Sequence, residues 1–295
     1  MGIDSPNSMT LFVFIGFLLG ACLGSFLNVL AHRTPRGLSV VLPRSQCLGC
    51  SSFITWRDNL PILGWLLLKG RARCCGAKIP IRYFGVEIVV ALCFAWFFSN
   101  FLAHGDIGFL VSSCFFLWIL VGVIVTDLET MLIPDRLSVG GAGVGLVLSI
   151  IFPDLHGTHS YSHLNQHVYG GILSLVAILV GSGLLYWIGA IAGMAMQREA
   201  LGEGDIKLVG CIGAFCGWKG AIFSIFGGAL LGCLILLPLF VLQRLRHRDG
   251  DGSDSLNWGK EIPFGPYLAI AGLIYFFGIN ATLGKWFDWL GYWGI

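Results

Sequence analysis

Long apolar stretches constrain this chain more than any other feature of its sequence. Eight of them have the composition of membrane helices, which need about 20 apolar residues. Charged residues make up only 12% of the chain, about half the share of an ordinary soluble domain. We therefore expect an all-α polytopic membrane protein with about eight transmembrane helices, and exclude a soluble enzyme, a disordered regulator and a secreted disulfide scaffold. The stretches run at about 9–31, 83–103, 109–126, 137–152, 168–197, 206–218, 221–242 and 262–283.

Basic residues predict how these helices are oriented. Nine of the 18 Lys and Arg residues lie in 32–82, here called the cysteine loop. Cytoplasmic loops are enriched in Lys and Arg, which assigns this loop to the cytoplasm. Counting alternately from it puts sixteen of the 18 inside and both termini outside. The stretch 206–218 is short, but without it the basic cluster at 244–248 would fall on the wrong side.

The first apolar stretch has two further features. Gly16, Gly20 and Gly24 stand four residues apart, which predicts close packing against another helix. No Lys or Arg precedes this stretch, and its apolar run exceeds twenty residues. We therefore expect a retained membrane helix and not a cleaved signal peptide.

Four of the ten cysteines lie in the cysteine loop: Cys47, Cys50, Cys74 and Cys75. A reducing compartment disfavours a structural disulfide, and a loop of this length is too small to build a good core. Four thiolates therefore favour a zinc site. Because adjacent cysteines project differently, free thiols in a membrane-anchored loop stay open as the alternative. The other six cysteines lie in apolar stretches and read as small buried hydrophobes.

Two carboxylates at the edges of apolar stretches are candidate catalytic groups, because acidic residues there are costly and mark function. Asp127 ends the third stretch and Asp205 begins the sixth. The predicted topology puts both at the cytoplasmic edge. If they meet, they can share one proton, so that one acts as a base on water and the other donates to the scissile carbonyl. The glycines at 202 and 204, on either side of Glu203, would admit an extended peptide backbone.

Structural explanations exist for each of these residues. Asp127 could face water at a helix end or pair with Arg136, and Asp205 could stabilise a helix dipole. Asp135 competes with Asp127 for the first catalytic role, although it better suits the cap of the fourth helix. Lys207 either tunes the carboxylate pair or extends to the interface.

The external loop after residue 152 carries four of the seven histidines: His156, His159, His163 and His167. The last three are four residues apart and would share one helical face, so metal capture is conceivable. A polar loop that happens to be rich in histidine is the favoured interpretation.

An ordered set of motifs covers nearly the whole chain and resembles bacterial type IV prepilin leader peptidases, which are Gly-x-Gly-Asp membrane aspartic proteases. The Gly-x-Gly-Asp tetrapeptide alone would be weak, but the ordered set is specific. The matching segments are Gly24-Ser25-Phe26-Leu27-Asn28-Val29, Leu42-Pro43-Arg44-Ser45, Asp58-Asn59-Leu60-Pro61, Gly64-Trp65, Lys69-Gly70-Arg71, Arg82-Tyr83, Val86-Glu87, Asp127, Ile133-Pro134-Asp135, Gly202-Glu203-Gly204-Asp205-Ile206-Lys207-Leu208 and Pro263-Phe264-Gly265-Pro266.

The resemblance implies that Asp127 and Asp205 are the catalytic pair, with Gly202, Glu203, Gly204 and Lys207 in the active-site loop. It further implies cleavage of the basic leader of prepilins or pseudopilins after a glycine, on the cytoplasmic side. Members of this family also methylate the new N-terminus with S-adenosylmethionine, and the cysteine-bearing loop is implicated in that step. The expected location is the bacterial inner membrane; membrane lipids are expected partners and nucleic acid is not.

The resemblance also suggests three parts: a first helix (1–31), a methyltransferase and zinc region (32–82) and a seven-helix peptidase domain (83–295). One departure concerns zinc. The family has two Cys-x-x-Cys pairs, and Ala72 stands at the first cysteine of the second pair. Cys74 could replace that ligand, or the site could have three cysteines or no metal. Two other functions stay open: a proton-coupled transporter that uses Asp127 and Asp205 as a relay, and a non-catalytic assembly factor with a zinc loop.

Overall fold

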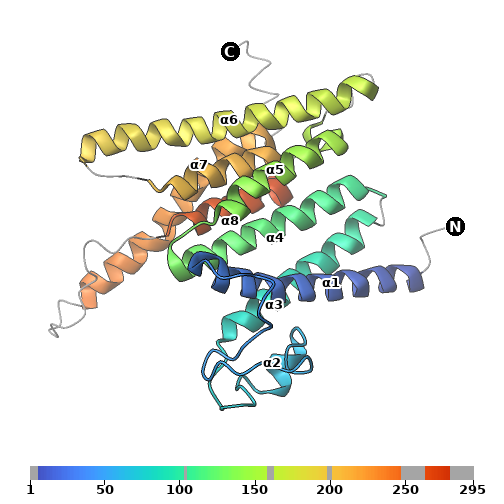
Figure 1. The fold of residues 1–295 in the computed structure, drawn as a ribbon. Helices are drawn as coiled ribbons and strands as arrows, with labels where there is room; N and C mark the ends of the chain where they lie inside the picture. Colours follow the sequence, from blue (N-terminus) through green and yellow to red (C-terminus); the bar gives the residue numbers. More distant parts are fainter. Residues whose placement is uncertain (1–5, 103–104, 158–162, 198–200, 247–262, 280–295) are drawn as a thin grey trace, which may run out of the picture. The chain divides into compact units, whose positions relative to one another are not determined.

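The computed structural model describes residues 6–102, 105–157, 163–197, 201–246 and 263–279. Over these residues the chain is helical, with two isolated β-bridges and no strand (Figure 1). The all-α prediction is therefore confirmed. The chain divides into two compact units, Met1–Pro134 and Asp135–Ile295.

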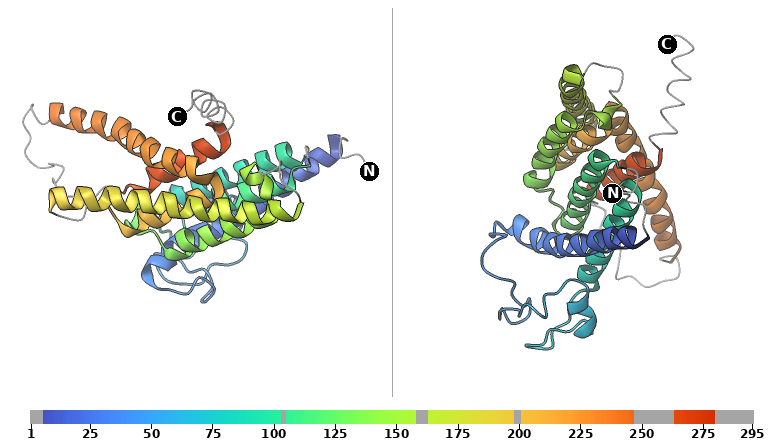
Figure 2. Two further views of the ribbon diagram at one scale, coloured as in Figure 1. Left: turned by 90° about the horizontal axis from the view of Figure 1, so that it is seen from above. Right: turned by 90° about the vertical axis from the view of Figure 1, so that its right-hand side faces the viewer.

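The first unit contains the helices α1 (Pro6–Arg33), α3 (Ile81–Phe97) and α4 (Ile107–Thr130). The cysteine loop joins α1 to α3 and includes the short elements η1 (Thr34–Arg36) and α2 (Leu63–Leu67). A π-helical turn, η2 (Phe98–Leu102), follows α3. The helix α1 lies along α3 and also contacts α4 (Figures 1 and 2).

The glycine stripe of α1 packs against α3, as the spacing predicts. A Cβ at Gly20 would lie 2.7 Å from the Ala91 Cα, and one at Gly24 would lie 2.9 Å from the Glu87 Cα. A Cβ at Gly16 would approach the Phe98 ring at 2.8 Å. Because no side chain fits between the two backbones, glycine is what allows this close approach.

Three helix ends meet at one end of the first unit. Asn28 near the end of α1 donates to the Tyr83 carbonyl at 3.0 Å. Arg82 at the start of α3 forms a salt bridge with Glu129 at the end of α4. At the opposite end of α4, Asp106 caps the helix by accepting from the Phe109 N–H at 3.0 Å.

The second unit contains α5 (Asp135–Ile151), η3 (Pro153–His156), α6 (His163–Met196), α7 (Glu203–Arg246), α8 (Gly265–Ile274) and the π-helical turn η5 (Tyr275–Ile279). The long helix α7 packs against α5, α6 and α8. Glycine again allows the closest contacts, since a Cβ at Gly213 would lie 2.6 Å from the Ala177 carbonyl oxygen.

The helix α7 is broken at Gly217, whose backbone is non-helical at φ 72° and ψ 176°. Three residues before this break, the Ala214 carbonyl accepts hydrogen bonds from the Ser149 hydroxyl at 3.2 Å and the Ser174 hydroxyl at 3.1 Å. A straight helix of 44 residues would be about 66 Å long, twice the thickness of a hydrocarbon core. The sequence predicts separate helices at 206–218 and 221–242, and the break lies within three residues of that boundary.

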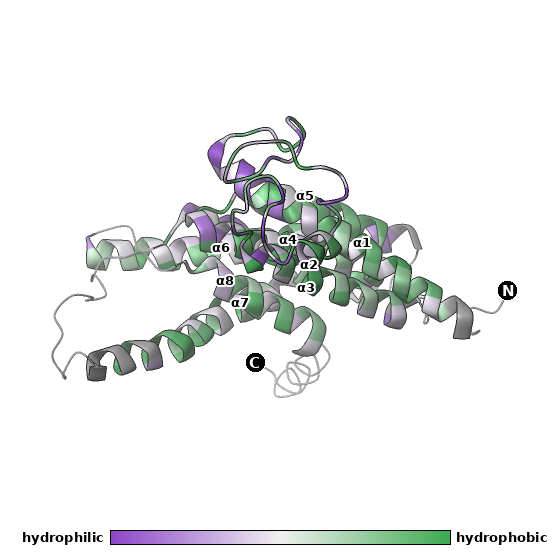
Figure 3. Cartoon of the chain, turned by 90° about the horizontal axis from the view of Figure 1, so that it is seen from below, coloured by the Kyte–Doolittle hydropathy of each residue, from purple (hydrophilic) through white to green (hydrophobic). Residues whose placement is uncertain are grey.

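Among the residues that the structure describes, five helices are long and apolar enough to cross a membrane: Met9–Arg36, Ile81–Asn100, Ile107–Thr130, Asn165–Met196 and Glu203–Pro238. Apolar residues dominate these helices, while polar residues gather in the cysteine loop (Figure 3). The chain is therefore a multi-pass membrane protein. The predicted number of eight is supported only in part, because α5 has 17 residues, the apolar helix at 265–278 is also short, and the broken α7 counts as one span.

Candidate catalytic and metal-binding sites

Asp127 lies near the end of α4 in the first unit, and its side chain is buried, with 4% exposure. The helix ends because Met131 adopts a left-handed conformation at φ 54°, with its N–H bonded to the Asp127 carbonyl at 2.9 Å. The backbone of Asp127 is therefore held in the last turn of α4. The interpretation of Asp127 as a water-facing helix-end carboxylate is wrong.

Asp205 lies in the first turn of α7 in the second unit and is also buried, with 9% exposure. Its backbone N–H donates to the Gly202 carbonyl at 3.2 Å. The adjacent Ile206 carbonyl accepts from the Ser182 hydroxyl of α6 at 3.1 Å, which holds the start of α7 against α6. At Gly202 a Cβ would lie 3.5 Å from an Asp205 carboxylate oxygen, so the glycine leaves open the space beside this carboxylate.

Lys207 forms a salt bridge with Asp135 at 2.8 Å, which joins the start of α7 to the start of α5. Glu203 lies farther away, at 3.9 Å from the Lys207 ammonium, and its side chain is 91% exposed. Asp135 is the first residue of α5. The ammonium of Lys207 is therefore held by a carboxylate and does not simply extend to the interface.

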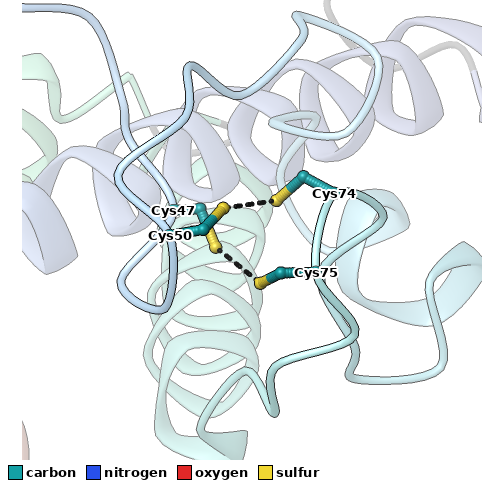
Figure 4. Close-up of side chains that lie close together, drawn as sticks. All are labelled: Cys47, Cys50, Cys74 and Cys75. Carbon is teal, nitrogen blue, oxygen red and sulfur yellow. Dashed lines mark hydrogen bonds between the residues drawn. The ribbon is translucent and has the colours of Figure 1, made fainter.

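The four loop cysteines come together, as the zinc prediction requires (Figure 4). The Cys47 and Cys75 sulfurs are 3.6 Å apart, and the Cys50 and Cys74 sulfurs are 3.3 Å apart. All four sulfurs lie within 4.8 Å of one another. A tetrahedral zinc with bonds of about 2.3 Å separates its sulfurs by about 3.8 Å, so these four residues fit the ion with small adjustments.

Two similar turns carry the cysteines. In the first, the Gln46–Phe53 bridge encloses a turn in which Cys47 donates to the Ser52 carbonyl and accepts from the Ser51 N–H, both at 2.9 Å. In the second, the Arg71–Lys78 bridge encloses a turn in which Ala72 makes the equivalent bonds to Ala77 and Gly76, both at 2.8 Å. Ala72 therefore occupies the position of Cys47, and Cys74 occupies that of Gly49.

Hydrogen bonds favour the thiolate form of the first cysteine pair. The hydroxyl and the backbone N–H of Ser52 lower the pKa of Cys50 to about 6. The Gly49 and Cys50 backbone N–H groups lower the pKa of Cys47. Thiolates are the form that ligates zinc.

A cavity of about 310 Å³ adjoins this cluster within the first unit. Its walls come from the end of α1, the cysteine loop and the start of α3, and they include Asn28, Cys47, Asp58 and Glu87. The sequence predicts a methyltransferase and zinc region at 32–82, but it predicts neither this cavity nor a role for Glu87. Glu87 is a carboxylate inside an apolar stretch, which is the same signal that identified Asp127 and Asp205, and that signal could have found it.

The histidines of the second unit do not form one cluster where the structure describes them. His156 Nε2 lies 2.9 Å from the Ser149 hydroxyl, and His167 Nδ1 lies 2.6 Å from the Ile150 carbonyl oxygen. Burial lowers the pKa of His156 to about 4. The side chains of His159 and His163 lie outside the described residues.

Two family models match the chain in succession. The Bacterial Peptidase A24 N-terminal domain matches residues 18–101, and the Type IV leader peptidase family matches residues 114–237. The chain belongs to the type IV leader peptidase family. As a leader peptidase it is a membrane-embedded enzyme, and the family resemblance seen in the sequence is confirmed. No solved structure matches it significantly.

Curated relatives of this leader peptidase carry the name prepilin leader peptidase/N-methyltransferase. The protein from Myxococcus xanthus is 35% identical over 231 residues, covering 77% of this chain and 64% of the relative. The protein from Aeromonas hydrophila is 31% identical, with 88% of each chain covered. The protein from Dichelobacter nodosus is 27% identical, with 94% of each covered. The chain therefore spans just under two thirds of the Myxococcus protein and most of the other two.

Proposed function

We propose that this leader peptidase removes the leader peptides of type IV prepilins or pseudopilins, cutting after a glycine on the cytoplasmic side. Asp127 and Asp205 are the catalytic carboxylates in this proposal. The observation that carries it is that both are buried and held near helix ends in a leader peptidase. A buried carboxylate without a functional reason is costly, and two of them can share one proton.

The chemistry follows from that shared proton. The ionised carboxylate takes a proton from water, which attacks the scissile carbonyl, and the protonated carboxyl donates to the carbonyl oxygen. Gly202, Glu203 and Gly204 form the loop along which the extended leader passes Asp205. Lys207, held by Asp135, positions the start of α7 and adds positive charge near the carboxylate pair.

The proposed topology has eight spans, with both termini periplasmic and the protein in the bacterial inner membrane. The break at Gly217 supports eight, because it divides α7 into two segments. The basic cysteine loop then lies in the cytoplasm with Asp127 and Asp205 at the same membrane edge. The proposed parts are the first helix (1–31), the methyltransferase and zinc region (32–82) and the peptidase domain (83–295).

We also propose that the enzyme methylates the new N-terminal amine, with S-adenosylmethionine as donor. The names of the relatives support this second activity. Cys47, Cys50, Cys74 and Cys75 hold zinc in this proposal, and their sulfurs have the spacing for it. A closed four-thiolate site is structural, so zinc would stabilise the fold of the cysteine loop and take no part in either reaction.

The purified protein, incubated in detergent with a prepilin and S-adenosylmethionine, tests the proposed function. We expect the product mass to show loss of the leader and gain of one methyl group, and omission of the donor to remove only the methyl. An intact prepilin after incubation with folded enzyme would contradict the peptidase assignment. A cleaved but unmethylated product would contradict only the second activity.

A further inference from the structure

Nine consecutive residues of the cysteine loop, 60–68, carry no charged, hydroxyl or amide side chain. They include the short helix α2 (Figure 1) and are here called the leucine segment. Four of its leucines leave much of their surface uncovered, with exposed fractions of 39% at Leu60, 55% at Leu63, 48% at Leu66 and 73% at Leu67. A group of exposed leucines indicates contact with a further apolar partner.

The other face of the leucine segment packs along the helix pair α1 and α3. Ile62 belongs to a buried apolar cluster with Ala21 of α1 and Ala91 of α3. Trp65 stacks on Phe84 of α3, with the ring centroids 5.0 Å apart. The segment therefore lies against the sides of these two helices and not beyond their ends.

The positions of these contacts give the depth of the leucine segment, because α1 and α3 are both long and apolar enough to span a membrane. Ala21 lies twelve residues before Arg33, the last residue of α1, which is about 18 Å along the helix. Ala91 lies ten residues after Ile81, the first residue of α3, which is about 15 Å. A typical helix tilt of about 20° shortens these depths by only about 1 Å. Since a hydrocarbon core is about 30 Å thick, Ile62 lies well inside it.

The backbone of the leucine segment is bonded as hydrocarbon requires, where each unpaired N–H group is costly. The N–H groups of residues 63, 64, 66 and 68–71 donate to carbonyls of the segment itself. The Ile62 N–H donates to the Glu87 carboxylate at 2.7 Å, and Ser25 bonds to the same carboxylate. The Trp65 indole N–H donates to the Ile79 carbonyl at 3.3 Å. Glu87 thus pairs a donor that enters the apolar layer, which explains a carboxylate at this depth of α3.

Basic residues and a tryptophan flank the leucine segment. Arg57 lies over the Trp56 ring, 5.4 Å from its centroid, and Trp56 is 72% exposed. Lys69 and Arg71 follow the segment directly. Asp58 is the one acidic residue of the cysteine loop, and it forms a salt bridge with an arginine of the loop. Tryptophan and basic side chains on both sides of an apolar segment are typical of an interface with anionic lipid headgroups.

We propose that the leucine segment is a re-entrant anchor, which places Leu63, Leu66 and Leu67 among the acyl chains of anionic phospholipids. Nine residues are fewer than half of the about 20 that a helix needs to cross the bilayer, so the segment enters and leaves on the side of the cysteine loop. Arg57 and Lys69 then lie at the level of the lipid phosphates. The anchor depends on α1 and α3 as membrane spans and on neither leader cleavage nor methylation.

Photo-cross-linking tests the anchor in full-length protein held in nanodiscs of phosphatidylethanolamine and phosphatidylglycerol. With p-benzoylphenylalanine in place of Leu67, we expect irradiation to raise the protein mass by one phospholipid. Leu179 of the membrane-spanning α6 is 64% exposed and is the positive control. Leu48, 62% exposed between two cysteines of the metal cluster, should give no lipid adduct.

The outcomes separate lipid from the other partners that an apolar surface could bind. A lipid adduct at position 179 without one at position 67 would overturn the anchor. Cross-links from position 67 to a second copy of the chain or to added prepilin, in place of lipid, would refute it as well. Equal lipid labelling at positions 67 and 48 would show that the leucine segment has no special contact with the bilayer.

Leu67→Asp supplies a second readout in the same nanodiscs. A carboxylate among acyl chains is costly, whereas one on a water-exposed surface is not. We therefore expect the unfolding temperature of Leu67→Asp to fall by about 4 °C or more. The matched control Leu48→Asp should change it by less than about 1 °C. Equal unfolding temperatures of the two variants would place Leu67 in water and contradict the proposal.

Discussion

At the scale of single residues, burial and hydrogen-bonding partners decide which reactions a carboxylate can take part in. Asp127, Asp205 and Glu87 are all buried carboxylates, whereas Asp135 is 67% exposed and paired with Lys207. The sequence places Asp135 close to Asp127 and offers it as a competitor. Burial and pairing differ between the two, which supports our proposal for Asp127, because an exposed and salt-bridged carboxylate has little reason to share a proton.

Cys74 illustrates a proposed zinc ligand that spacing alone could not assign. The sequence left open four, three or no metal ligands, since the second pair is adjacent and Ala72 precedes it. Only the repeated turn shows that Ala72 occupies the place of Cys47, and that the Cys74 sulfur nevertheless reaches the other three. That information is three-dimensional, because the two turns are 25 residues apart in register.

Zinc content tests this assignment. We expect about one zinc per wild-type chain and a loss of more than half of it in Cys74→Ser, because a four-thiolate site loses one ligand. Ala72→Cys combined with Cys74→Gly should restore zinc, since position 72 matches Cys47. Metal analysis of the purified variants measures this. Full zinc in Cys74→Ser, or none in wild type, would contradict the site.

His156 predicts a pH dependence of stability. Its pKa is lowered from 6.5 to about 4 by burial, so the unfolded chain binds a proton that the folded chain does not. The free energy of unfolding should therefore fall as the pH drops from about 6.5 to about 4, by about 3 kcal/mol in all. Thermal unfolding at several pH values measures this. In His156→Gln this loss of unfolding free energy on acidification should be absent. A variant with the same pH profile as wild type would contradict the assignment of the pH dependence to His156.

At the scale of helices, the sequence predicted features that repeat along one helix. It did not predict contacts between segments that lie far apart along the chain. The stripe of Gly16, Gly20 and Gly24 identified the packing face of α1 but not its partner, because the partner lies about 70 residues away. The break in α7 was predicted from charge counting and lies at Gly217. The cavity was missed, since its walls come from two helices and a loop with no shared pattern.

The packing of α1 on α3 predicts the effect of Gly20→Ala. The new methyl group would meet the Ala91 Cα and the Val90 carbonyl oxygen, both at 2.7 Å. Because backbone atoms cannot move aside, we expect a loss of about 1–3 kcal/mol of stability. The matched control is Gly85→Ala on α3, where a Cβ would meet nothing within 4 Å. Thermal unfolding compares the two, and equal stabilities would contradict the packing.

The break in α7 predicts the effect of Gly217→Ala. Gly217 has φ 72° and ψ 176°, a region that side-chain-bearing residues rarely enter, at a cost of about 1–3 kcal/mol. We expect a lower unfolding temperature for this variant. The helical Gly143, with open space at its Cβ, serves as control, because Gly143→Ala should be neutral or stabilising. A lower unfolding temperature in the control alone would contradict a break at Gly217.

At the scale of the whole molecule, the chain combines two compact units, and the proposed pair takes one carboxylate from each. The first unit also holds the cysteine cluster and the cavity beside it. The second supplies Asp205, the loop before it and the broken helix α7.

Leader cleavage by Asp127→Asn and Asp205→Asn tests the central claim most directly. Each substitution keeps the size of the side chain but removes a proton-sharing carboxyl group, so cleavage should fall at least a thousandfold while expression and folding stay unchanged. Asp135→Asn serves as the discriminating variant and should retain cleavage. Cleavage that persists in Asp127→Asn or Asp205→Asn, or that is lost in Asp135→Asn but not in Asp127→Asn, would contradict the account.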